Sequence, residues 1–112
     1  MKPDDFRRIA LSMPEASENA HMGHPDFRVG GRIFATLGYP DDFFGVVMLS
    51  PEEQEKFVRA DPAAFKPAKG AWGQRGSTTV QLDAVDSATL RNAIATAWRK
   101  RAPKRLITQK TG

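Results

Sequence analysis

A pair of glycines between two short runs of strand-forming residues constrains this 112-residue chain more than any other feature. The runs are Asp26–Val29 and Arg32–Leu37, and Gly30-Gly31 joins them. A two-residue connection between antiparallel strands requires positive φ, which glycine adopts without a steric penalty, so we expect a β-hairpin. One face of each strand is predicted to carry its apolar side chains: Phe27 and Val29 in the first, and Ile33, Ala35 and Leu37 in the second.

Three further segments extend this hairpin into a sheet. Residues 43–49 form an apolar run that is too short for a helix and is typical of a central strand. Residues 78–82 alternate between polar and apolar side chains and predict another strand, with Val80 and Leu82 on one face. Residues 64–76 have proline and glycine on both sides and predict a short strand followed by a loop.

The first helix is predicted near the start of the chain, where Asp4 or Asp5 caps it and Pro14 ends it. Its apolar residues recur at the spacing of one helical face: Phe6, Ile9, Ala10 and Met13. Arg7 and Arg8 then lie on the opposite, solvent-facing side. Residues 15–25 are polar and predict a connection to the hairpin.

Two more helices are indicated by their capping residues. The second begins at a capping box in which Ser50 is the N-cap, Pro51 follows it and Glu53 closes the box. The last helix is capped by Asp86 or Ser87 and carries an apolar stripe that consists of Leu90, Ile94, Ala97 and Trp98.

The order α-β-β-β-α-(β)-β-α predicts an α+β fold of two layers, with an antiparallel sheet and helices packed on it. A chain of this length forms one domain. We expect that domain to span residues 1–102 and to be followed by a basic C-terminal tail over residues 103–112.

The composition excludes several kinds of site. Without cysteine the chain has no disulfide, no thiol nucleophile and no cysteine-based metal centre. The N-terminus shows no signal peptide and no stretch approaches 18 apolar residues, so we expect a cytoplasmic protein without a membrane span. We expect no cofactor.

His21 and His24 form the one histidine pair of the sequence. A zinc site needs a third ligand, for which Asp26 or Glu18 is available, but the spacing in a glycine-containing loop differs from that of the helical zinc motifs. We therefore expect these histidines to make hydrogen bonds or stack at the sheet edge, and we expect no metal. The serines and the adjacent carboxylate pairs have roles in caps and turns, so no enzyme is predicted.

Charge is distributed unevenly along the chain. Residues 87–112 contain no acid and carry a charge of +7, whereas residues 1–86 carry −3, which together give the net charge of +4. A segregated positive charge favours polyanions such as nucleic acid. Cations in the last turn of a helix also complement the helix dipole, which explains Arg99, Lys100 and Arg101 but not Lys104, Arg105 and Lys110 beyond Pro103.

The segment between residues 66 and 75 combines cations with one aromatic side chain. Lys66, Lys69 and Arg75 surround Trp72, a mixture that suits phosphate contact together with base stacking. Alternatively, Trp72 folds back to cover the sheet while the cations are solvated, which is the more usual fate of a large aromatic residue.

Several segments resemble the MmcQ/YjbR family of small bacterial proteins over about residues 5–101. The resemblance rests on residues 8–15 (RIALSMPE), residues 21–37 (HMGHPDFRVGGRIFATL), the pieces 70–73 and 76–78, and the closing helix through Trp98. It implies a two-layer α+β fold similar to a double-wing DNA-binding domain, and members are usually described as DNA-binding. The family has no widely recognised catalytic residues to transfer to this chain.

We therefore expect a non-enzymatic domain that binds nucleic acid, DNA in particular, mainly through its phosphates, as a monomer or weak dimer. The predicted contact residues are Lys69, Trp72, Arg75, Arg99, Lys100, Arg101, Lys104 and Arg105. One alternative is a protein-interaction or chaperone-like module that uses an exposed sheet face with Phe27, Phe34 and Phe44 as anchors. Another is a small-molecule pocket around His21 and Trp72.

Overall fold

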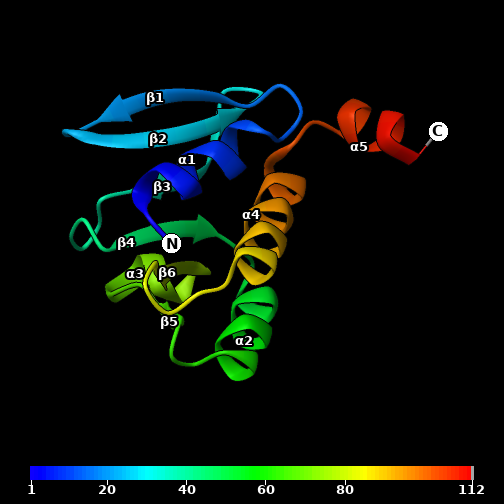
Figure 1. Ribbon diagram of the computed structural model, residues 1–112. Helices are drawn as coiled ribbons and strands as arrows, with labels where there is room; N and C mark the ends of the chain where they lie inside the picture. Colours follow the sequence, from blue (N-terminus) through cyan, green and yellow to red (C-terminus); the bar gives the residue numbers. More distant parts are fainter. Residues whose placement is uncertain (112) are drawn as a thin grey trace.

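The computed structural model describes residues 1–111 and has the predicted α+β fold, with helices packed on a six-stranded antiparallel sheet (Figure 1). Eleven elements follow one another in the described residues: α1 (Pro3–Leu11), β1 (Ser17–His21), β2 (His24–Val29), β3 (Arg32–Leu37), β4 (Phe44–Met48), α2 (Pro51–Ala60), β5 (Phe65–Pro67), α3 (Gly70–Gln74), β6 (Ser77–Gln81), α4 (Ser87–Arg101) and α5 (Lys104–Thr111).

The predicted order of elements is confirmed, and the structure adds β1, α3 and α5 to it. Strand β1 lies inside the segment predicted as a polar connection, because its exposed residues form a sheet edge and carry no apolar alternation. Helix α3 is five residues long and contains two glycines, which conceal it in the sequence. Helix α5 begins directly after Pro103, where the sequence predicted a tail.

The six strands follow the order β1-β2-β3-β4-β6-β5, so the run predicted as a central strand lies inside the sheet as β4. Helices α1 and α4 pack against β3 and β4 on one face, which we call the covered face. Gly45 marks this face, because a Cβ atom there would lie 2.5 Å from the ring of Phe6 on α1. The opposite face, which we call the open face, carries no long helix among the described elements and is approached by α3 (Figure 1).

A β-bulge in β3 changes which side chains reach each face. Phe27 pairs with Ala35 while the next residue of β2, Arg28, pairs with Ile33, so Phe34 is the extra residue of the bulge. Phe34 is fully buried in the core beside Ala35, whereas Ile33 lines a hollow of the open face. The prediction that Ile33 shares the core face with Ala35 was therefore wrong, because regular alternation ignores the extra residue.

The structure also contradicts two of the predicted anchors of a protein-interaction surface. Phe27 and Phe34 are both fully buried in the core and are not available to a partner. Phe44 is half-buried, and Phe43 beside it is the exposed aromatic residue of this segment, at 66%.

The helix stripes are confirmed, since every residue predicted for the inner faces of α1 and α4 is buried. The capping box at Ser50 is also confirmed, as is the cap by Asp86, which accepts a hydrogen bond from the backbone N–H of Thr89 at 2.7 Å. The predicted cap of α1 was wrong: Lys2 is the N-cap, and Asp5 accepts a hydrogen bond from its backbone N–H from inside the first turn.

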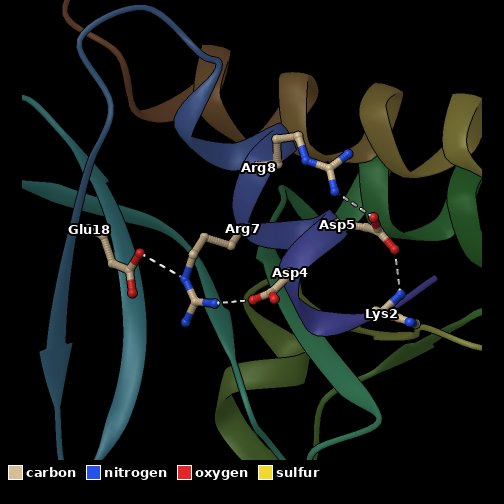
Figure 2. A network of polar contacts seen from close by, with 6 residues as sticks. All are labelled: Lys2, Asp4, Asp5, Arg7, Arg8 and Glu18. Atoms are coloured by element: carbon tan, nitrogen blue, oxygen red, sulfur yellow. Dashed lines mark hydrogen bonds and ion pairs between the residues drawn. The ribbon is translucent and has the colours of Figure 1, made fainter.

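Arginines on the outer side of α1 connect it to its surroundings (Figure 2). Arg7 donates to Asp4 of its own helix and to Glu18 of β1, at 2.7 and 3.0 Å, so it ties the helix to the edge strand. Arg8 donates to Asp5 at 2.9 Å. These exposed ion pairs contribute little stability, but they give both Arg7 and Arg8 acidic partners.

The C-terminal helix α5 is anchored to the rest of the fold. Leu106 is buried in the core, and Arg105 donates to both carboxylate oxygens of Glu15, each at 3.0 Å. Pro103 lies so close to Gly30 that a Cβ atom there would be 2.9 Å from the proline ring. The link between α4 and α5 therefore rests on the turn between β2 and β3.

No helix in the part of the chain that the structure describes is long and apolar enough to cross a membrane.

Candidate functional site

Four arginines surround a hollow at the end of the sheet where the turn between β2 and β3 lies. The hollow has a volume of about 500 Å³ and extends past Met48 to Trp72. We call it the arginine hollow, after Arg28, Arg32, Arg75 and Arg101. Arg28 lies on β2, Arg32 begins β3, Arg75 is the C-cap residue after α3, and Arg101 ends α4. The site therefore forms only when the chain is folded.

Most of these cations are not neutralised by a neighbouring acid. Arg32, Arg75 and Arg101 make no ion pair with any of the residues that the structure describes. Within the same residues, the Nε atom of Arg101 is buried without a hydrogen-bond partner. A guanidinium group in this situation favours an anionic ligand, because its donors are satisfied and its charge is compensated on binding.

The pKa of Lys100 is affected by two of these arginines. Burial lowers the pKa of its ammonium group below the usual value, and the charges of Arg101 and, more weakly, Arg32 act in the same direction, while Glu53 opposes them. The positive charges of Arg32 and Arg101 thus both disfavour the charged form of Lys100.

A second cavity, the aromatic pocket, adjoins the arginine hollow on the open face. It has a volume of about 300 Å³, and its lining includes His21, His24, Ile33, Tyr39, Met48 and Trp72. Trp72 is 51% exposed, and its ring lies 6.2 Å from that of Tyr39 at an interplanar angle of 58°. Ile33, Met48 and Trp72 line both cavities, which makes them two parts of one cleft.

A buried carboxylate beneath this cleft holds one residue of each part. Asp26 is fully buried, and its oxygens accept hydrogen bonds from Arg28 at 2.8 and 3.1 Å. His21 Nδ1 lies 2.8 Å from the same carboxylate. Hydrogen bonds from Arg28 are the main reason that the pKa of the Asp26 carboxyl is below its usual value; burial opposes this effect and the bond with His21 adds to it.

The network orients both ligand-facing groups. Because Asp26 is ionised near neutral pH, it accepts the hydrogen of His21 Nδ1, and the other ring nitrogen of a neutral His21 is then an acceptor. Arg28 is fixed by two bonds to one carboxylate, which restricts its long side chain. Polar groups that are positioned before a ligand arrives lose less entropy when it binds.

The residues predicted from the sequence as nucleic-acid contacts are divided by the structure. Trp72, Arg75 and Arg101 line the arginine hollow, and Lys69 is the exposed N-cap of the helix that carries Trp72. Arg99 is exposed on α4 but does not line the hollow, and Lys104 begins α5. Arg105 is engaged with Glu15, and Lys100 is exposed in the last turn of α4 and does not line the hollow.

Sequence reasoning missed Arg28 and Arg32 as site residues. A signal for the first was present, because Asp26 and Arg28 are two residues apart in a predicted strand and must share one of its faces. Together they form a polar face opposite Phe27 and Val29. Arg32 follows the glycine turn directly and could have been predicted only from the way the hairpin meets α3 and α4.

The two histidines line the aromatic pocket. Among residues 1–111, no group of three or more histidine, cysteine or acidic side chains is arranged to hold a metal ion. His21 is committed to Asp26 through Nδ1, so the pocket and its hydrogen bond account for its position.

Comparisons with known proteins agree on the fold. A family model described as YjbR matches residues 11–100 of the chain. The crystal structure of Deinococcus radiodurans protein DR2400, with a domain described as DUF419, is similar with a TM-score of 0.72 and 22% identity. That similarity covers 87% of this chain and 75% of the other and extends to the fold alone. No curated protein matches this sequence.

Proposed function

The chain belongs to the YjbR family, and we propose that it is a non-enzymatic domain that binds nucleic acid, DNA in particular, mainly through contacts with phosphates. It acts in the bacterial cytoplasm as a monomer or weak dimer. The observation that carries the proposal is the arginine hollow, in which three of four guanidinium groups lack an acidic partner among the described residues.

The geometry of the hollow suits a phosphate backbone. Arginine donors match the oxygens of a phosphate in pairs, and phosphate contacts fix the position of a nucleic acid without reading its sequence. The hollow lies at one end of the central strands and opens to solvent, so a nucleic-acid strand can pass through it. Helix α4 presents its stripe to the core and only its last turn to the hollow, so no recognition helix is proposed.

The alternative of a protein-interaction module has less support. Two of its three proposed anchors, Phe27 and Phe34, lie in the core. Among the large apolar side chains that are exposed in the described residues, Met22 and Trp72 line one pocket, whereas Leu11 and Phe43 do not. Trp72 is also bordered by arginines. Charge beside an aromatic ring favours a nucleic acid over an apolar protein partner.

The salt dependence of binding tests the proposal. For a single strand, log K falls with log salt by about 0.7 for each neutralised phosphate, so four arginines predict a slope of about −3. The double variant Arg32→Ala/Arg75→Ala removes two exposed cations of the hollow. We expect it to flatten the slope by about 1.4, measured by fluorescence anisotropy in a salt series.

A matched variant controls for net charge. Arg8→Ala/Arg59→Ala also removes two exposed arginines, but these lie on α1 and α2 and are paired with Asp5 and Glu55. We expect this variant to keep the slope of the unmodified protein. If both double variants change the slope equally, the hollow is not the binding site, and if the unmodified protein binds no nucleic acid, the function is wrong.

A further inference from the structure

We propose that the aromatic pocket receives one unstacked base of a single strand whose phosphates lie in the arginine hollow. This inference rests on the proposed function and specifies its partner as single-stranded nucleic acid. It concerns a different part of the cleft, namely the apolar side beyond Trp72, which the phosphate contacts do not use.

The aromatic pocket and the arginine hollow are continuous. Because Ile33, Met48 and Trp72 line both of them, one ligand can occupy both at once. Such a ligand needs a flat, largely apolar part next to an anionic part. A nucleotide within a strand has this composition, with its base on one side of the sugar and its phosphates on the other.

The walls of the aromatic pocket are largely aromatic and apolar. Trp72 and Tyr39 present two aromatic rings, and Trp72 is half exposed although apolar aromatic side chains are normally covered. Ile33 of β3 and Met48 of β4 form the apolar floor of the pocket. A base that stacks on these rings covers apolar surface that solvent otherwise contacts.

The imidazole of His21, a polar group of the pocket, is already oriented by a hydrogen bond. His21 is bonded through Nδ1 to Asp26, so its remaining ring nitrogen is available to the edge of a base. The same carboxylate holds Arg28 in the arginine hollow. One buried group thus sets the relative position of a base-facing side chain and a phosphate-facing side chain.

The size of the pocket excludes a paired base. A volume of about 300 Å³ lies at the lower end of ligand cavities and suits one ring system with its sugar. A base within a duplex is stacked on both faces and paired at its edge, so it must leave the helix to enter. The protein is therefore expected to bind single strands more tightly than duplexes.

Three probes test this inference: a thymidine single strand about ten nucleotides long, its duplex with a complementary strand, and an abasic single strand with as many phosphates as the thymidine strand. The abasic strand keeps the phosphate contacts and removes every base. We expect the thymidine strand to bind about 5- to 150-fold more tightly than the abasic strand, which corresponds to one stacked base. The duplex is expected to bind more weakly than the thymidine single strand.

Variants locate the effect. Trp72→Ala is expected to remove the advantage of the thymidine strand while affinity for the abasic strand stays the same, and Trp72→Phe is expected to restore part of it. Phe43→Ala is the matched control, because Phe43 is also an exposed aromatic residue but does not line the pocket. Tyr39→Ala provides a second pocket variant if Trp72→Ala fails to fold.

The outcomes separate the inference from the proposed function. If thymidine and abasic strands bind equally to the unmodified protein, the base pocket is wrong although the phosphate site stands. If Trp72→Ala and Phe43→Ala reduce the advantage equally, the base is bound elsewhere. If none of the probes binds, the proposed function itself is wrong.

Discussion

The covered and open faces of the sheet hold their side chains in different ways. Beneath α1 and α4, Phe6, Phe34 and Trp98 are almost completely buried among other apolar side chains. On the open face a single buried carboxylate, Asp26, holds two partly exposed side chains by hydrogen bonds. Apolar burial stabilises in proportion to area and has no preferred direction, whereas a hydrogen bond adds little net stability but fixes orientation. The covered face therefore stabilises the fold, and the open face presents oriented groups.

The largest expected effect comes from two neighbouring residues that the bulge sends to opposite faces. Phe34→Ala should lower the free energy of unfolding by about 3–5 kcal/mol, because it leaves a cavity in the core. Ile33→Ala, at a half-buried position of the cleft, should cost only about 1–2 kcal/mol. Chemical denaturation of both variants measures the difference, and equal losses would contradict the assignment of these residues to different faces.

Asp26→Asn should have an intermediate effect, which depends on pH. Removal of a charged partner from a buried network costs about 1–3 kcal/mol at neutral pH. The pKa of Asp26 is lower in the folded than in the unfolded chain, so its contribution is present above the unfolded value of about 4 and is lost as the pH falls through the folded value. The stability gap between the unmodified protein and the variant should therefore close as the pH falls below about 4.

Comparison with the unmodified protein isolates this effect. Asp5, Glu15 and Asp86 also have lowered pKa values, but they are present in both proteins and cancel in the difference. A gap that stays constant down to about pH 3 would mean that the charge of Asp26 does not stabilise the fold.

The smallest expected effect distinguishes the two tryptophans. Trp98 is buried and donates its indole N–H to the carbonyl of Pro14, whereas Trp72 is half exposed. Trp72→Ala should change the free energy of unfolding by less than about 1 kcal/mol, since surface substitutions have small effects. Thermal unfolding measures this change, with Trp98→Ala as the reference for a core loss of about 3–5 kcal/mol. A comparable loss for Trp72 would mean that its main role is to cover the sheet.

The two faces also differ in how well the sequence predicts them. The stripes of α1 and α4 were predicted residue by residue, because helical spacing follows burial directly. The bulge at Phe34 was not, because nothing in an alternating run marks one extra residue. The edge strand β1 was missed for another reason: both its faces are exposed, so selection for burial leaves no pattern in it.

For the cleft, local sequence composition predicted only some of the residues that line it. The mixture of cations and one aromatic residue pointed to Trp72 and Arg75, which do lie at the arginine hollow. Charge counting at the C-terminus pointed equally to Arg101, which lines the hollow, and to Arg105, whose partner Glu15 is 90 residues away in the chain. A count of charges cannot distinguish them, because pairing depends on which distant segments the fold brings together.

The bulge in β3 also affects how sequences of relatives should be aligned with this one. Phe34 is the residue without a cross-strand partner, so a relative that lacks one residue at this point can keep a regular strand. Counting from the glycine turn still gives the counterpart of Ile33, and counting back from the end of the strand still gives the counterpart of Thr36. A gap placed elsewhere in the hairpin would exchange residues of the core for residues of the cleft between that position and the bulge.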